Sequence, residues 1–148
     1  MQSTLSPSSS ALASRLRLAI ARTARRLRQE AGADLSPSLS SALASIDRHG
    51  PLTPSELAAR EGVRRPTVTR VLGRLQESGL VVRTADVNDG RSCLIAISPA
   101  GHEVMEELRT RKDAYLARRL DDLTAEDRVV LDRAAGILER VLEEAPGE

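Results

Sequence analysis

Aromatic side chains are almost absent from this chain of 148 residues, which has one Tyr and neither Phe nor Trp. RNA and single-stranded DNA are bound largely by stacking bases on aromatic side chains, so the composition argues against both ligands. A core without aromatic rings has to be filled by Leu, Val, Ile and Ala, which suits closely packed helices. The composition thus indicates a mainly helical protein and leaves double-stranded DNA open as a partner.

Cysteine and histidine are also scarce, with one Cys and two His. The single cysteine, Cys93, permits neither an intramolecular disulfide nor a zinc site built from cysteines. The sequence also lacks a nucleophile elbow, a phosphate-binding glycine loop and an HExxH motif. We therefore expect no metal, no cofactor and no enzymatic activity.

Long apolar runs are missing as well, because the uncharged stretches fall far short of the ~20 apolar residues that a membrane span needs. Residues 1–13 have neither the basic start nor the apolar segment of a secretory signal. The length suits one domain, or one domain with helical arms. These features predict a cytoplasmic protein with no membrane partner.

Charge is distributed unevenly along the chain. Residues 1–91 contain 14 Arg and 8 acidic residues, whereas residues 92–148 contain 8 basic and 13 acidic residues. Of the 22 basic residues 21 are Arg. Arginine recognises phosphate and guanine through paired hydrogen bonds, but a preference for Arg over Lys also reflects genomic base composition. The asymmetry therefore gains meaning only beside a local motif.

The two ends of the chain are predicted to be helical. Residues 1–10 are rich in Ser and predict a disordered arm, and from Ala11 apolar residues recur at helical spacing until Gly32. Ser98-Pro99 starts a second long helix that reaches Leu120. Thr124 and Asp127 have the spacing of a capping box, which predicts the start of a last helix.

Between these ends lies the outline of a helix-turn-helix. A helix is predicted from Ser36-Pro37 to His49, followed by a short one that a Thr53–Glu56 capping box begins and Gly62 ends. A longer helix then runs from about Arg65 to Gly79. Short helix, tight turn and longer helix are the succession typical of this motif.

A helical projection of residues 66–75 separates two faces of the longer helix. Aliphatic residues form the face expected to be buried, and the opposite face carries Thr69, Arg70 and Arg74, with Thr67 at the boundary. Small hydroxyls and arginines can enter a major groove about 12 Å wide. Any solvated helix has a polar outer face, so this pattern alone does not distinguish a DNA-contacting helix from an ordinary surface helix. The context in the neighbouring sequence has to decide between them.

That context is a predicted β-hairpin over residues 80–97. Two β-prone runs, 80–84 and 93–97, flank the turn sequence Asn88-Asp89-Gly90. A hairpin after a helix-turn-helix forms a wing, and Arg91 beside its tip can reach a minor groove. The alternative is that the charged residues of this loop only make it soluble and pair with one another.

These residues resemble the winged-helix regulators of the multiple antibiotic resistance regulator (MarR) family. The resemblance covers residues 11–143, and its most specific pieces are 52–58, 65–75, 79–81 and 86–91. It implies a mainly α (α+β) fold in which residues 35–98 form a winged helix-turn-helix with a two-stranded wing. It also implies that residues 11–34 and 99–148 form a helical dimerisation region.

The function implied by the resemblance is sequence-specific binding of double-stranded DNA. A homodimeric repressor would hold a palindromic operator with helix 65–78 and wing 85–92 of each subunit. Many relatives are released by small aromatic acids or other lipophilic effectors bound where the helical base meets the lobe. An alternative class is a helical adaptor, which would need exposed apolar anchors on residues 65–74 for protein contacts.

The resemblance also assigns roles to single residues. Bases would be contacted by Thr67, Thr69 and Arg70, phosphates by Arg65 and Arg74, and the minor groove by Arg91, with Asp86 anchoring the wing. Two positions depart from the family pattern: Asn88 stands where a basic residue is usual, and Arg64 replaces a hydroxyl N-cap and offers a phosphate contact. The candidate DNA-binding residues are therefore Arg64, Arg65, Thr67, Thr69, Arg70, Arg74, Asp86, Asn88 and Arg91.

Four further features each allow more than one interpretation. Cys93 is a redox sensor or a buried structural thiol. His49 and His102 line a ligand pocket or a metal site, or they are ordinary side chains near helix ends. Tyr115 binds a carboxylate effector or packs in the dimer. The arginines between residues 22 and 28 bind an anion, or they are solvated or paired with the acidic last helix.

Overall fold

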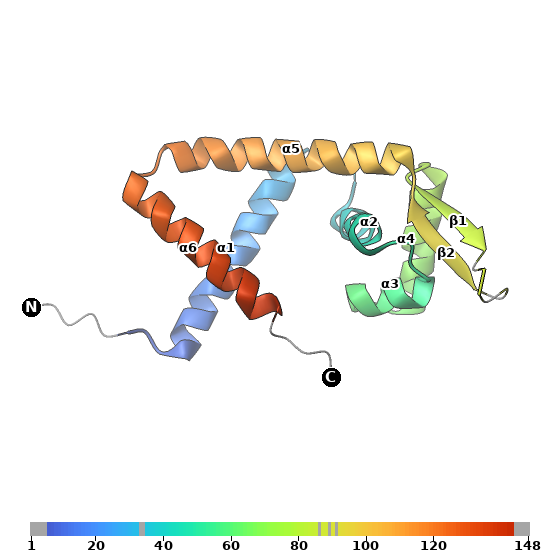
Figure 1. Cartoon of the computed structure of the whole chain (residues 1–148), viewed down its shortest axis with the longest axis horizontal. Helices are drawn as coiled ribbons and strands as arrows, with labels where there is room; N and C mark the ends of the chain where they lie inside the picture. The colour runs from blue at the N-terminus through green and yellow to red at the C-terminus, as the bar shows by residue number, and fades with distance from the viewer. Residues whose placement is uncertain (1–5, 33–34, 86, 89, 91, 144–148) are drawn as a thin grey trace, which may run out of the picture. The chain divides into compact units, whose positions relative to one another are not determined.

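The computed structural model describes residues 6–32, 35–85, 87, 88, 90 and 92–143. Within these residues the protein is mainly helical, with one two-stranded antiparallel sheet, so the predicted fold class is confirmed (Figure 1). The elements are α1 (Ser9–Glu30), α2 (Pro37–His49), α3 (Pro54–Glu61), α4 (Arg65–Glu77), β1 (Val81–Ala85), β2 (Cys93–Ile97), α5 (Pro99–Asp121) and α6 (Ala125–Glu143).

The chain divides into two compact units, residues 1–112 and residues 113–148, and the division falls inside α5. No helix of the described residues is long and apolar enough to cross a membrane.

Helix α1 begins at Ser9, where the hydroxyl of Ser8 accepts a hydrogen bond from the amide of Ala11 at 3.3 Å. The last residues of the predicted disordered arm are therefore helical, and residues 1–5 lie outside the described part.

The short helix α3 is fixed at both ends by the residues that the sequence singles out. The Thr53 hydroxyl accepts from the Glu56 amide at 3.2 Å, and the Glu56 carboxylate accepts from the Thr53 amide at 2.7 Å. Gly62 follows the helix with φ +63°, a left-handed conformation that costs glycine little. Both ends of the predicted helix are confirmed.

The winged helix-turn-helix, residues 35–98, is called the lobe below. Its core is aliphatic, as the composition predicts. Its fully buried side chains come from α2, α3, α4 and β2: Leu43, Ile46, Leu57, Val68, Leu72, Leu75 and Ile95. The hairpin pairs Val81 with Ile97 and Ala85 with Cys93, so β1 lies one residue later than the predicted run. A buried aliphatic side chain contributes about 1.5–3 kcal/mol relative to exposure, which makes this cluster the main stabilising feature of the lobe.

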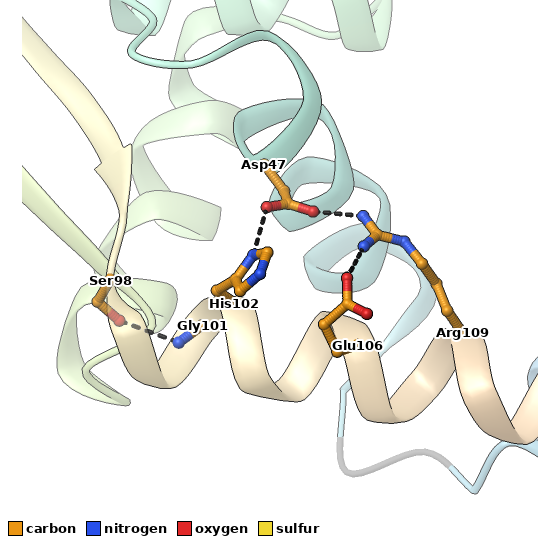
Figure 2. Close-up of polar contacts among 6 residues, drawn as sticks. All are labelled: Asp47, Ser98, Gly101, His102, Glu106 and Arg109. Carbon is orange, nitrogen blue, oxygen red and sulfur yellow. Dashed lines mark hydrogen bonds and ion pairs between the residues drawn. The ribbon is translucent and has the colours of Figure 1, made fainter.

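Helix α5 starts in direct contact with the end of the helix-turn-helix. The Ser98 hydroxyl donates to the Gly79 carbonyl at 2.5 Å. It also accepts from the Gly101 amide at 3.0 Å (Figure 2). A Cβ atom on Gly101 would lie 2.1 Å from the Leu80 carbonyl oxygen. The absence of a side chain at this position therefore lets α5 approach the backbone that leads into β1.

An aspartate of α2 ties this helix to α5 further along. The Asp47 side chain is 8% exposed, and it pairs with the Arg109 guanidinium and with Nδ1 of His102, 3.1 Å away (Figure 2). Arg109 also pairs with Glu106 on its own helix. The hydrogen bond to His102 and the nearby Arg109 charge lower the pKa of Asp47, although burial opposes them.

We expect Gly101→Ala to lower the free energy of unfolding by about 1–3 kcal/mol, because the new methyl group overlaps backbone rather than a flexible side chain. Urea unfolding followed by circular dichroism measures the change. Gly73→Ala is the control, since a Cβ there meets nothing within 4 Å. Removing a glycine from a helix interior should stabilise the protein by about 0.5–1 kcal/mol. Equal effects of the two substitutions would contradict the close approach.

Asp47→Asn should destabilise the protein by about 0.2–1 kcal/mol near neutral pH, because it removes the charged acceptor of two exposed donors, His102 and Arg109, which can bond to water instead. A carboxylate with a lowered pKa stabilises the fold above the pKa of the unfolded chain, about 3.9. That contribution is lost as the pH falls through the lower folded value. Urea midpoints between pH 3 and pH 7 should therefore converge for the two proteins in acid, and a constant difference would refute the assignment.

Candidate nucleic-acid interface

The buried and exposed faces of α4 lie where the helical projection places them. Val68, Val71, Leu72 and Leu75 are its buried residues. The side chains of Arg64, Arg65, Thr69, Arg70 and Arg74 are exposed, and Thr67 is half-buried at the boundary. The helix therefore presents small hydroxyls and arginines on one continuous outer face.

The first turn of α4 is held by contacts other than a side-chain cap. Arg64 occupies the N-cap position without a capping hydrogen bond, as its sequence predicts. Arg65 donates from Nη1 to the Ser55 hydroxyl of α3 at 3.0 Å, and its carbonyl accepts from the Thr69 hydroxyl at 3.0 Å. The Arg65 side chain thus joins the first turns of the two helices, a contact that sequence reasoning missed because Ser55 has no distinguishing spacing.

Arg70 and Arg74, further along α4, differ from Arg65 in their contacts. Neither Arg70 nor Arg74 has a hydrogen bond or ion pair with another side chain in the described part of the chain. Together with Thr67, Ser36, Ser38 and the aliphatic Leu39 and Val71, they border a hollow of about 280 Å³ beside the helix. Both guanidinium groups are therefore available to an anionic partner.

The other end of α4 is attached to the wing through one arginine that the sequence analysis did not single out. Arg83 of β1 donates from Nε to the side-chain amide oxygen Oε1 of Gln76 at 3.0 Å. Its Nη1 lies 3.9 Å from the Cys93 sulfur of β2, so one side chain touches α4 and both strands. Only the folded hairpin brings these three residues together, and no spacing in the sequence indicates it.

Of the three predicted wing residues, the structure describes Asn88. Asn88 lies exposed in the loop between the strands, next to Val87, which is 97% exposed. Asp86 and Arg91 lie outside the described residues, so their predicted roles as wing anchor and minor-groove contact stay predictions. The hairpin that carries them is confirmed.

The remaining candidates are placed as follows. Cys93 is half-buried in β2, and His102 is engaged by Asp47, whereas His49 is exposed at the end of α2. Tyr115 has the Arg119 guanidinium 5.5 Å from its ring centroid. In the described residues no group of three metal-ligating side chains exists.

The adaptor alternative requires exposed apolar anchors on α4. Among the described residues of this helix no large hydrophobic side chain is exposed, and the nearest one is Val63, 40% exposed in the preceding turn. A surface of Thr and Arg suits phosphates and base edges better than an apolar protein partner.

Comparison with known proteins agrees with this geometry. The MarR family model matches residues 35–93, from α2 to the start of β2. An uncharacterized HTH-type transcriptional regulator of Mycobacterium bovis is 38% identical over 136 residues, which are 91% of this chain and 95% of that protein.

Solved structures of regulators and MarR family proteins are similar to this chain in fold. A Pseudomonas aeruginosa protein described as a transcriptional regulator has 32% identity and a TM-score of 0.80, with 93% of this chain and 99% of that chain covered. A MarR family protein of Bacillus stearothermophilus has 25% identity and a TM-score of 0.78, with 91% and 95% covered. The Mycobacterium bovis and Pseudomonas aeruginosa proteins are named as transcriptional regulators. The chain belongs to the MarR family of DNA-binding transcriptional regulators.

Proposed function

We propose that the protein is a homodimeric repressor that binds a palindromic operator through residues 65–78 and the wing, 85–92. The observation that carries this proposal is the outer face of α4, where Arg70 and Arg74 are exposed beside Thr69. An arginine that enters the major groove can bind guanine O6 and N7 with two hydrogen bonds. The exposed Arg64 and Arg65 at the start of the helix are suited to phosphates.

Homodimerisation is supported by the terminal helices, which bury no residue within the chain. Helix α1 exposes four large apolar side chains: Leu12, Leu16, Leu18 and Ile20. Helix α6 exposes six more: Val129, Val130, Leu131, Ile137, Val141 and Leu142. Covering such surfaces with a second copy would remove apolar area from water and would set the two lobes about 34–36 Å apart for adjacent major grooves.

Release by a small effector is the regulatory part of the proposal. A cavity of about 300 Å³ lies in the first unit, between the segment after α1, the end of α4 and α5. Leu35, Leu80, Val104 and Leu108 provide apolar walls, and Arg111, which is paired there with Glu107, adds a guanidinium that the carboxylate of an effector would share with Glu107. An aromatic acid or another lipophilic ligand suits this lining, and an effector that changes the lobe spacing would lower DNA affinity without touching the bases.

Arg70→Ala is expected to weaken operator binding by about 1–3 kcal/mol and to relax base preference at one position of each half-site. Fluorescence anisotropy with DNA from upstream of the protein's own gene measures both effects, with scrambled DNA as the reference and a series of salt concentrations. Arg118→Ala is the matched control because it removes the same charge from α5, outside residues 35–98. Intact operator binding by both Arg70→Ala and Arg91→Ala would show that the assigned DNA face is wrong.

Val141→Asp should convert the dimer to a folded monomer, because Val141 is 62% exposed in the isolated chain and needs no intrachain partner. Light scattering after size exclusion gives the mass, and circular dichroism shows whether the helices persist. Arg133→Asp on the same helix is the control at an exposed polar position. A monomeric parent protein, or a dimer that survives Val141→Asp, would contradict the assignment of α6 to the interface.

A further inference from the structure

A second cavity lies within the helix-turn-helix itself, away from the cavity assigned to the effector above. It measures about 310 Å³ and is bounded by the amino end of α2, the carboxyl end of α3 and the first turns of α4. Its walls are mainly aliphatic and include Ala42, Leu57, Val63, Val68 and Val71. Small-molecule sites are typically cavities of about 300–1,000 Å³ with apolar walls and a few placed polar groups.

The placed polar group of this cavity is the carboxylate of Glu61. One oxygen accepts from the Ser41 hydroxyl at 2.5 Å, and the other accepts from the Ser45 hydroxyl. A carboxylate has about four acceptor positions, so each oxygen keeps a lone pair for a further donor. The two serines therefore fix the orientation of Glu61 without using all of its capacity.

The negative charge of Glu61 is not neutralised within the described residues, since its recorded partners are two hydroxyls and no Arg, Lys or His. Glu61 is also the last residue of α3, where the carbonyl groups of the helix end add partial negative charge. The amino ends of α2 and α4 also border the cavity and carry partial positive charge, so the preference for a cation depends on the full charge of the Glu61 carboxylate. An anion would meet like charge at the rim of the cavity.

We propose that this cavity binds a small aliphatic ammonium compound. Its apolar body lies against the Leu and Val side chains of the walls, and its N–H groups donate to the free lone pairs of Glu61. A hydrogen bond between two charged groups is about twice as strong as a neutral one, so the ammonium is preferred over a neutral compound of the same shape.

The site is linked to DNA binding through Thr67, which lines the cavity and belongs to the candidate base contacts. This part of the inference rests on the proposed function. A ligand held against Thr67 changes the edge of the surface offered to the bases and so lowers operator affinity. Because the coupling is reciprocal, operator DNA lowers the affinity for the ammonium compound by the same factor.

The experiment titrates the full-length protein, labelled at Leu and Val methyl groups, with three probes of one shape. These are cyclohexylmethylammonium, the neutral cyclohexylmethanol and cyclohexanecarboxylate. The ammonium should shift the methyl signals of Leu57, Val63, Val68 and Val71 and bind about tenfold more tightly than either other probe. No probe moving these signals, or all three binding equally, would overturn the site.

Glu61→Gln tests the role of the charge, and Glu103→Gln is the matched control because it removes an exposed carboxylate from α5. The ammonium should lose its advantage over the alcohol in Glu61→Gln and keep it in Glu103→Gln. Unchanged binding of the alcohol by Glu61→Gln shows that the cavity is still formed. An ammonium preference that survives Glu61→Gln would refute the proposed contact.

Operator affinity is then measured with and without saturating ammonium compound. It should fall in the parent and in Glu103→Gln, and stay constant in Glu61→Gln. Probe binding with no change in operator affinity would overturn the link through Thr67 and leave the site itself supported. Failure of the parent to bind any operator without probe would refute the proposed function, whereas the methyl titration would still decide on the cavity.

Discussion

Burial of one side of α4 is the constraint on which the rest of the lobe depends. Val68, Val71, Leu72 and Leu75 recur at steps of three and four residues, so a single face of the helix enters the core. Once that face is fixed against α2 and α3, the direction of every other side chain on α4 follows from helical geometry. Thr69, Arg70 and Arg74 face outward because the aliphatic residues on the opposite side of the helix are held in the core.

Contacts at both ends of α4 join it to the neighbouring elements. Arg65 and Ser55 join its first turn to α3, and Arg83 joins its last turns to the hairpin through Gln76. These are exposed polar contacts, which individually contribute little stability. Their value lies in restricting the angles between elements that a nucleic acid would have to touch together.

Much of this could be predicted from the sequence because its signals are local. The capping box at Thr53, the stop at Gly62 and the turn between residues 85 and 92 each depend on a few neighbouring residues, and the structure has the corresponding elements. The spacing of the aliphatic residues in α4 likewise predicted which residues of this helix are buried. Helix starts were less exact, as Ser8 and Ser9 illustrate, because several serines in a row are all competent caps.

The contacts that were missed all join side chains of different helices or strands. Asp47 meets His102 and Arg109, Gln76 meets Arg83, and Glu61 meets two serines of α2. Aspartate, glutamate and arginine are ordinary surface residues, and nothing in their spacing distinguishes the buried or paired ones. Only the packing of the helices determines which charged side chains lose water and which partners they find.

The hydrogen bond from Thr69 to the carbonyl of Arg65 has a consequence for the chemistry of the outer face. A hydroxyl can donate one hydrogen bond, and here Thr69 donates it to the backbone carbonyl of Arg65. Toward a base, the side chain then offers only oxygen lone pairs and a methyl group. Such a side chain complements the amino groups of adenine and cytosine or the methyl group of thymine, and it has nothing to donate to guanine O6. A bond internal to the helix would in this way bias the sequence that the helix reads.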